Sequence, residues 1–113
     1  MSDSGGLTGA YGRFVASAPP PVLPPEAGNL IRTGFIDLCA TLIAGRGETV
    51  VAILGKHVRE RGGPKEASLL LGHERAASQD AALLNGTAGH AHDYDDVALA
   101  GHPSTVLVPA ILA

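Results

Sequence analysis

Apolar residues recur with the period of an α-helix over residues 25–45. Four of them are spaced by four, three and four positions: Ile31, Phe35, Leu38 and Leu42. Three further apolar residues widen this stripe: Ile36, Ala40 and Ile43. The pattern therefore predicts a helix that is buried on two sides. Pro25 suits its first turn, and Gly45 is expected to end it in left-handed geometry.

The same period predicts two more helices. Residues 48–61 form one of them, with these side chains inward: Val50, Val51, Leu54 and Val58. Gly62-Gly63-Pro64 ends it, and the apolar run 67–71 fits either a short strand or a buried connector. The other helix has Ser78 as its N-cap and leads toward His90. Its small residues, Ala82, Gly86 and Gly89, would let another backbone approach closely.

Residues 1–24 have a different composition. Gly5, Gly6 and Gly12, with prolines at 19–21 and 24–25, are expected to prevent regular helix and to favour extended geometry. The apolar side chains Tyr11, Phe14 and Val15 either dock on the rest of the protein or belong to a disordered segment. The predicted organisation is a Pro/Gly-rich tail, 1–24, followed by an all-α domain, 25–113.

Composition narrows the class of protein. The 113 residues include four aromatic residues and no Trp, so the core must be aliphatic and alanine-rich, as suits close helix packing. A net charge of −3 offers no general attraction to nucleic acid or to an anionic membrane. No stretch has the roughly 18 uninterrupted apolar residues of a membrane span, and residues 1–6 lack the pattern of a secretion signal. We therefore expect a cytoplasmic protein, with the single cysteine, Cys39, buried as a small apolar residue.

Most of the residues that could take part in catalysis or metal binding lie between Asn85 and His102. This window holds three of the five histidines and three of the eleven acidic residues: His90, His92, His102, Asp93, Asp95 and Asp96. If the helix continues past His90, the pairs His90/Asp93 and His92/Asp96 each share a helix face. Imidazoles and carboxylates in this arrangement fit either a metal site on His90 and His92 or a general acid/base pair.

Two residues of this window are the candidates for catalysis. Asp93 follows an alanine-rich stretch that we expect to be buried, where a carboxylate needs a partner. His102 lies on a Gly-His-Pro-Ser turn, which presents an imidazole to a cleft while Pro103 starts the next helix. Together they form a proton-transfer pair for chemistry beside a carbonyl or a carboxylate. Asp95 and Asp96 are expected to cap the next turn or helix, and Asn85 to satisfy buried backbone groups.

The window resembles the MmgE/PrpD family, which includes 2-methylcitrate dehydratase, cis-aconitate decarboxylase and iminodisuccinate epimerase. The resemblance covers roughly residues 25–113. It rests on three segments, Asn85-Gly86, His90-Ala91-His92-Asp93-Tyr94-Asp95-Asp96 and Gly101-His102-Pro103-Ser104, and on the earlier run Leu42-Ile43-Ala44-Gly45. Members are several-fold longer, with a large helical domain and a smaller α+β lid, so the chain is similar to an incomplete N-terminal part of the helical domain.

The resemblance implies a lyase or isomerase of a small polycarboxylate, usually a homodimer without metal or organic cofactor. It implies catalytic roles for Asp93 and His102 and substrate binding by His90 and Ser104. No Lys or Arg follows Arg75, so the cations that a polycarboxylate needs would come from elsewhere, and we expect the chain alone to be inactive. Two alternatives stay open: an inactive helical interaction module, and a metal-binding module on His90 and His92.

Overall fold

The computed structural model describes residues 6–17, 23–98 and 100–113. In these ranges the chain forms five helices and two short strands, in the order α1 (Gly6–Ser17), α2 (Pro25–Gly45), α3 (Thr49–Arg61), β1 (Ala67–Ser68), β2 (Arg75–Ala76), α4 (Ser78–His90) and α5 (Pro103–Leu112). The strands form one small antiparallel pair, with Ala67 opposite Ala76. The predicted all-α class is confirmed, and the run 67–71 is partly a strand.

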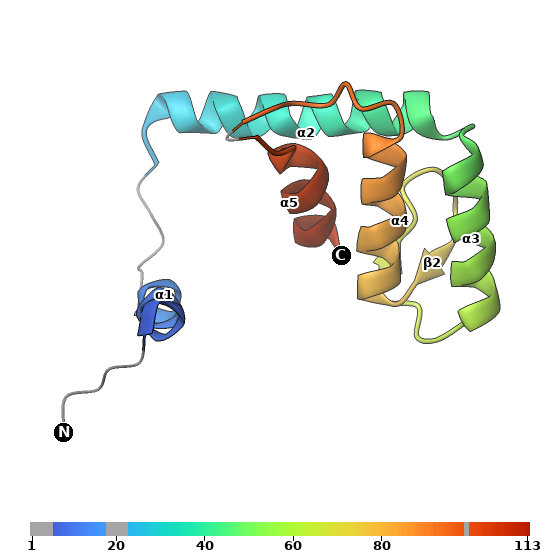
Figure 1. Cartoon of the computed structure of the whole chain (residues 1–113), viewed down its shortest axis with the longest axis horizontal. Coiled ribbons are helices and arrows are strands. Elements are labelled where there is room, and N and C mark those ends of the chain that lie inside the picture. Colours follow the sequence, from blue (N-terminus) through green and yellow to red (C-terminus); the bar gives the residue numbers. More distant parts are fainter. Residues whose placement is uncertain (1–5, 18–22, 99) are drawn as a thin grey trace.

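α4 lies at the centre of the fold. It packs against α2, α3 and α5, and Figure 1 shows α3 on one side of it and α5 on the other, with α2 crossing their ends. After α4, residues 91–98 run along α2 (Figure 1), where the backbone N–H of Asp96 donates to the Asp37 carboxylate at 3.2 Å. The window that concentrates histidines and aspartates therefore lies where three helices meet.

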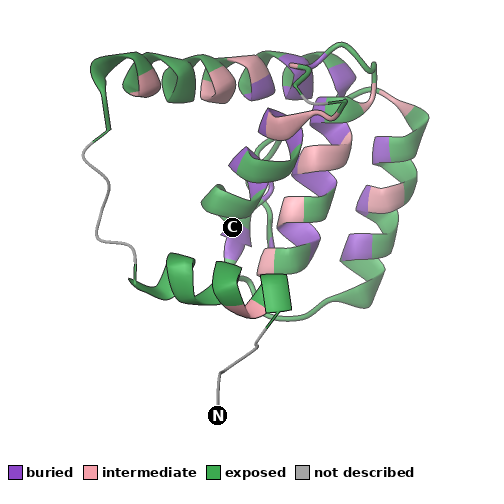
Figure 2. Ribbon diagram, turned by 60° about the vertical axis from the view of Figure 1, so that its left-hand side comes forward, coloured by how far each residue is buried: buried purple, intermediate pink, exposed green. Residues whose placement is uncertain are grey.

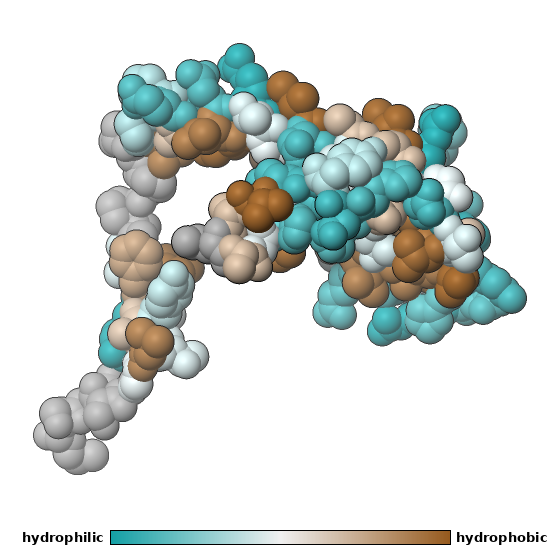
Figure 3. All heavy atoms as spheres, turned by 45° about the horizontal axis from the view of Figure 1, so that its top comes forward, coloured by the Kyte–Doolittle hydropathy of each residue, from teal (hydrophilic) through white to brown (hydrophobic). Residues whose placement is uncertain are grey.

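α2 is buried on one side only. Its buried residues are Leu38, Thr41, Leu42 and Gly45. Ile36 and Ile43, by contrast, are 62% and 57% exposed, and Cys39 is exposed as well. The predicted two-sided burial and the predicted burial of Cys39 are wrong, because α4 and α5 cover a single face of the helix. Figure 3 shows apolar residues along α2 lying open at the surface.

α2 also has the length and apolar character of a membrane-crossing helix, although no uninterrupted apolar run was found in its sequence. Of its most apolar window, 17% is buried inside the protein. This match rests on length and composition alone, and core helices of soluble proteins pass the same test. Leu38 and Leu42 of this helix are buried against the rest of the fold.

Gly45 has a role that differs from the predicted one. Its φ is not positive, and the residue after it, Arg46, has right-handed helical geometry with φ −54°. A Cβ on Gly45 would instead collide with the carbonyl oxygen of Ala88. Gly89 has the same function on α4, since its Cβ would lie 2.6 Å from Leu38 Cδ1. These two glycines let α2 and α4 approach closely, as the small residues of α4 predict.

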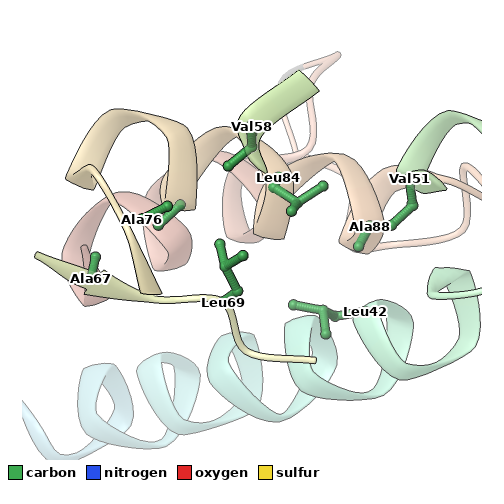
Figure 4. Close-up of a cluster of buried hydrophobic side chains, with 9 residues drawn as sticks. Leu42, Val51, Val58, Ala67, Leu69, Ala76, Leu84 and Ala88 are labelled. Atoms are coloured by element: carbon green, nitrogen blue, oxygen red, sulfur yellow. The ribbon is translucent and has the colours of Figure 1, made fainter. Parts of the chain in front are cut away.

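The hydrophobic core fills the space between α2, α3, α4 and the strand pair, and Figure 4 shows its side chains converging from these elements. It consists of Leu42, Val51, Val58, Ala67, Leu69, Ala76, Ala81, Leu84 and Ala88. Val51 and Val58 are inward as predicted, and Leu54 packs against the cluster. Val50 is 48% exposed, so its predicted burial is wrong. Gly62 ends α3 as predicted; it has φ 68° and donates its N–H to the Val58 carbonyl.

Two carboxylates hold the start of α4. Ser78 is the first helical residue rather than the predicted N-cap, and its N–H donates to Glu66 Oε2 at 3.1 Å. Asp80, which is almost fully buried, accepts from Arg61 Nη1 at 2.8 Å. A negative charge at a helix N-terminus is stabilising, and here Glu66 supplies the cap from outside the helix.

α1 contradicts the expected absence of regular helix in the N-terminal segment. Gly6–Ser17 is helical in spite of its glycines, because no proline lies within it. Tyr11 and Phe14 lie on one face with ring centroids 6.4 Å apart, yet each is 68% exposed. Figure 2 shows no buried residue on this helix, so its apolar side chains do not dock on the described body. The prolines at 19–21 lie outside the described residues.

Candidate active site

Asp95 is the centre of the site. Its side chain is 1% exposed, and its two oxygens point to two different imidazoles. Oδ1 lies 2.9 Å from His90 Nδ1, and Oδ2 lies 3.2 Å from His102 Nδ1. His90 is the last residue of α4, and His102 directly precedes α5. A buried carboxylate on the connecting loop therefore joins the ends of two helices.

Asp93 lies on the outer side of the same two imidazoles. Its Oδ1 is 3.4 Å from His102 Nε2 and 3.8 Å from His90 Nε2. The predicted proximity of His90 and Asp93 is confirmed. The predicted burial of Asp93 is wrong, because its side chain is 77% exposed.

The backbone explains where Asp93 points. α4 ends at His90, and the Asp93 N–H donates to the His90 carbonyl at 3.0 Å. Asp93 then adopts a left-handed conformation with φ 56°, which Asp tolerates better than most residues. This turn directs the Asp93 side chain outward and lets Asp95, two residues on, point inward.

The two imidazoles thus lie between an inner and an outer carboxylate. Their ring centroids are 4.5 Å apart, at an angle of 61°. Because an ionised carboxylate only accepts hydrogen bonds, His90 donates Nδ1–H to Asp95, which leaves the Nε2 lone pair facing outward. A buried acid that fixes the tautomer and orientation of an imidazole prepares the opposite nitrogen for proton transfer.

Asp96 holds the start of α5. Its carboxylate accepts from the Ser104 N–H at 3.0 Å and from the Ser104 hydroxyl at 2.7 Å. The predicted capping role of Asp96 is confirmed, although it acts from a preceding loop. Ser104, a predicted substrate-binding residue, is 7% exposed, so its hydroxyl faces Asp96 rather than the surface.

His92 is not part of this group. Its Nε2 lies 3.3 Å from the Ala44 carbonyl oxygen and 3.6 Å from Glu48, and its ring stacks on Tyr94 with centroids 5.3 Å apart. The expected pairing with Asp96 fails because α4 ends two residues before His92, so helical spacing no longer applies. The alternative of a metal site on His90 and His92 is therefore not supported by the geometry.

Asn85 has the predicted structural role. Its side-chain amide donates to the Ser68 carbonyl at 3.0 Å and its oxygen accepts from the Leu70 N–H at 3.0 Å. It joins α4 to β1 and to the segment that follows this strand. Asn85 also lines a hollow of about 800 Å³ between α3 and residues 69–74, which contains none of the clustered histidines or aspartates.

Comparison with protein families identifies the domain to which the chain belongs. Residues 10–113 match the MmgE/PrpD N-terminal domain, which is nearly the whole chain. The chain belongs to the MmgE/PrpD family. This is a family of 2-methylcitrate dehydratase-like enzymes. The match begins at residue 10, upstream of the resemblance seen in the sequence, so it includes most of α1.

Comparisons with curated proteins and with solved structures gave no significant match. The relation of this MmgE/PrpD chain to known proteins therefore rests on the match to the family domain.

The residue that sequence reasoning missed in this MmgE/PrpD site is Asp95. It was expected to cap a turn, as its neighbour Asp96 does. Its spacing gave no usable signal: in an extended run Asp93 and Asp95 would point to the same side, whereas the left-handed turn at Asp93 places them on opposite sides. Which side faced inward depended on where α4 ended.

Proposed function

We propose that the chain carries the imidazole–carboxylate part of the active site of a lyase or isomerase that acts on a small polycarboxylate, as in 2-methylcitrate dehydratase. One observation supports this most strongly: the Nε2 atoms of His90 and His102 both face Asp93, while Asp95 occupies their Nδ1 sides. Exposed basic groups oriented by a buried acid are what proton transfer requires.

The proposed chemistry removes a proton from the carbon next to a carboxylate. In a dehydration, the same site returns a proton to the departing hydroxyl, so that water leaves. Asp93 and His102 are the catalytic pair, since Asp93 Oδ1 and His102 Nε2 lie 3.4 Å apart at the surface of the protein. No metal or organic cofactor takes part in this reaction.

His90 and Ser104 are the proposed substrate-binding residues. His90 is the better placed of the two to contact a substrate. The His90 side chain is 46% exposed, so its Nε2 is accessible to a substrate carboxylate. The Ser104 hydroxyl donates to Asp96, a position better suited to holding α5, and with it His102. Asp95 is a positioning residue in this proposal.

The substrate's negative charge needs partners that the site itself does not supply. Among the described residues, the ion pairs of Asp93 and Asp95 are with histidines only. We propose that the cationic groups come from other parts of the enzyme or from the second subunit of a homodimer. We also propose that the enzyme acts in the cytoplasm. The alternative of an inactive helical interaction module has one supporting observation, the open apolar face of α2.

The test measures turnover of 2-methylcitrate, citrate and cis-aconitate. The chain is fused to, or co-expressed with, the remaining part of a family enzyme. Asp93→Asn and His102→Gln should each lower the rate by about 10²–10⁴-fold without loss of folding. His57→Gln, an exposed histidine on α3, is the matched control and should leave the rate unchanged.

The 113-residue chain alone should give no turnover, because no Lys or Arg pairs with the aspartates of the described site. Near-full activity of Asp93→Asn would contradict the assigned roles. So would a folded wild-type fusion that converts none of the three compounds.

A further inference from the structure

The hollow between α3 and residues 69–74 is a second concave site, separate from the proposed catalytic residues. Its volume of about 800 Å³ lies within the usual range of small-ligand pockets. Residues from the end of α2, from α3, from the segment between β1 and β2 and from α4 line it, and none of them belongs to the histidine–aspartate cluster. The reaction proposed above therefore leaves this hollow without a role.

The floor of the hollow is apolar. Val51 on α3, Leu69 after β1 and Leu84 on α4 line it, and Figure 4 shows these side chains coming from three different segments of the chain. Each is at most 8% exposed, so the core is closed beneath the hollow. Leu71, which also lines it, is 38% exposed. An apolar group that enters the hollow would cover this exposed surface, which favours binding.

Gly55 keeps the hollow open on the side of α3. Glycine weakens a helix interior relative to alanine, and the φ of Gly55 is not positive, so the backbone does not require it. A Cβ at this position would lie 3.4 Å from Arg59 Nη1 and 3.8 Å from Leu84 Cδ2. The absence of a side chain therefore lets the Arg59 guanidinium lie over the helix at the hollow.

Two arginines border the hollow. Arg59 Nη1 lies 3.7 Å from Glu74 Oε2, but both side chains are 57% exposed, so the pair is weak. Arg46, which follows α2, has no ion-pair partner among the described residues. Guanidinium groups bind carboxylates and phosphates through paired, charge-assisted hydrogen bonds. In a chain of net charge −3, this edge of the hollow is suited to an anion.

From this combination we infer that the hollow binds a small amphipathic anion, a molecule with an apolar chain and a terminal carboxylate or phosphate. The apolar chain lies on the floor of Val51, Leu69 and Leu84, and the anionic head lies toward Arg46 and Arg59. The head replaces the weak contact of Arg59 with Glu74. This inference goes beyond the proposed function and does not depend on it, because the two sites share no residue.

NMR titration of the isotope-labelled 113-residue chain with octanoate, octyl phosphate, octanol and inorganic phosphate tests the inference. We expect both octyl anions to shift the backbone amides of Gly55, Gly72 and Leu84, which line the hollow. Octanol and inorganic phosphate should bind at least about tenfold more weakly, because the first lacks the charge and the second lacks the apolar chain. The anion that binds more tightly identifies the head group, and either order supports the inference.

Charge variants locate the head group. Arg46→Gln and Arg59→Gln should each weaken binding of the octyl anions by about tenfold. Glu74→Gln should strengthen it by up to about fivefold, because it releases Arg59 from the exposed ion pair. Lys56→Gln is the matched control: it removes a positive charge from α3 outside the hollow and should leave the affinity unchanged.

All four substituted side chains are exposed, so the packing is retained, and circular dichroism checks the fold of each variant. The inference is overturned if neither octyl anion shifts these amides at about 10 mM. It is equally overturned if octanol binds as tightly as octanoate, or if Lys56→Gln weakens binding as much as Arg46→Gln does. No turnover is measured, so this test and that of the proposed function fail separately.

Discussion

At the scale of single residues, two neighbouring aspartates have different structural roles. Asp95 orients the His90 imidazole, and Asp96 caps α5 through Ser104. The difference arises from the end of α4: the left-handed Asp93 turns the chain, and successive side chains then point to different sides. Sequence spacing alone cannot assign these roles, because it does not show that the chain turns at Asp93.

Asp96→Asn should destabilise the chain by about 1 kcal/mol, the usual cost of losing a helix cap. The amide cannot accept both the Ser104 N–H and the Ser104 hydroxyl as the carboxylate does. Chemical denaturation measures the loss. Asp93→Asn is the matched control: Asn tolerates the left-handed conformation and the side chain is exposed, so its effect should stay within about 0.5 kcal/mol. Equal losses for both variants would contradict the capping role.

At the scale of helices, much of the fold could be predicted. Helical periodicity located α2 and α3, and the prolines and glycines located their ends. The glycines of α4 correctly indicated a close approach between backbones. α1 was not predicted because its glycines disfavour a helix, and this cost was taken to exceed the helical spacing of its apolar residues. The second buried face of α2 was predicted because periodicity shows which residues are apolar and cannot show whether a neighbour covers them.

The contact between α2 and α4 supplies the prediction at this scale. Gly45→Ala should destabilise the fold by about 2 kcal/mol or more, since its Cβ collides with the Ala88 carbonyl and forces the helices apart. Gly28→Ala is the control in the same helix. Its Cβ meets open space, so it should stabilise by up to about 1 kcal/mol. Thermal or chemical unfolding distinguishes them, and a neutral Gly45→Ala would mean that the helices do not pack so closely.

At the scale of the whole molecule, the chain is more extended than a compact domain of its length. Its radius of gyration is 16.8 Å, against about 13 Å expected for 113 residues. α1 and the first half of α2 lie away from the body and carry exposed apolar side chains. Exposed apolar surface of this extent is typical of a surface that another part of an assembly covers.

The family was recognisable from the sequence because its motif is local, and the match to residues 10–113 confirms it. The arrangement of the site was only partly recognisable. His90, Asp93 and His102 were identified and lie together. The linking role of Asp95 and the separation of His92 depended on tertiary contacts with α2 and α5, which a linear pattern does not contain.

The central claim is that Asp95 holds the His90 imidazole from inside by a hydrogen bond, so that the His90 Nε2 atom faces Asp93. Nitrogen NMR of the histidine side chains in the folded chain tests it directly, because it identifies which ring nitrogen carries the proton. We predict Nδ1–H for His90, which donates to Asp95, and Nε2–H for His92, which donates to the Ala44 carbonyl. In Asp95→Asn, His90 should lose this preference while His92 keeps its own. Nε2–H for His90 in the wild type, or no change in Asp95→Asn, would contradict the claim.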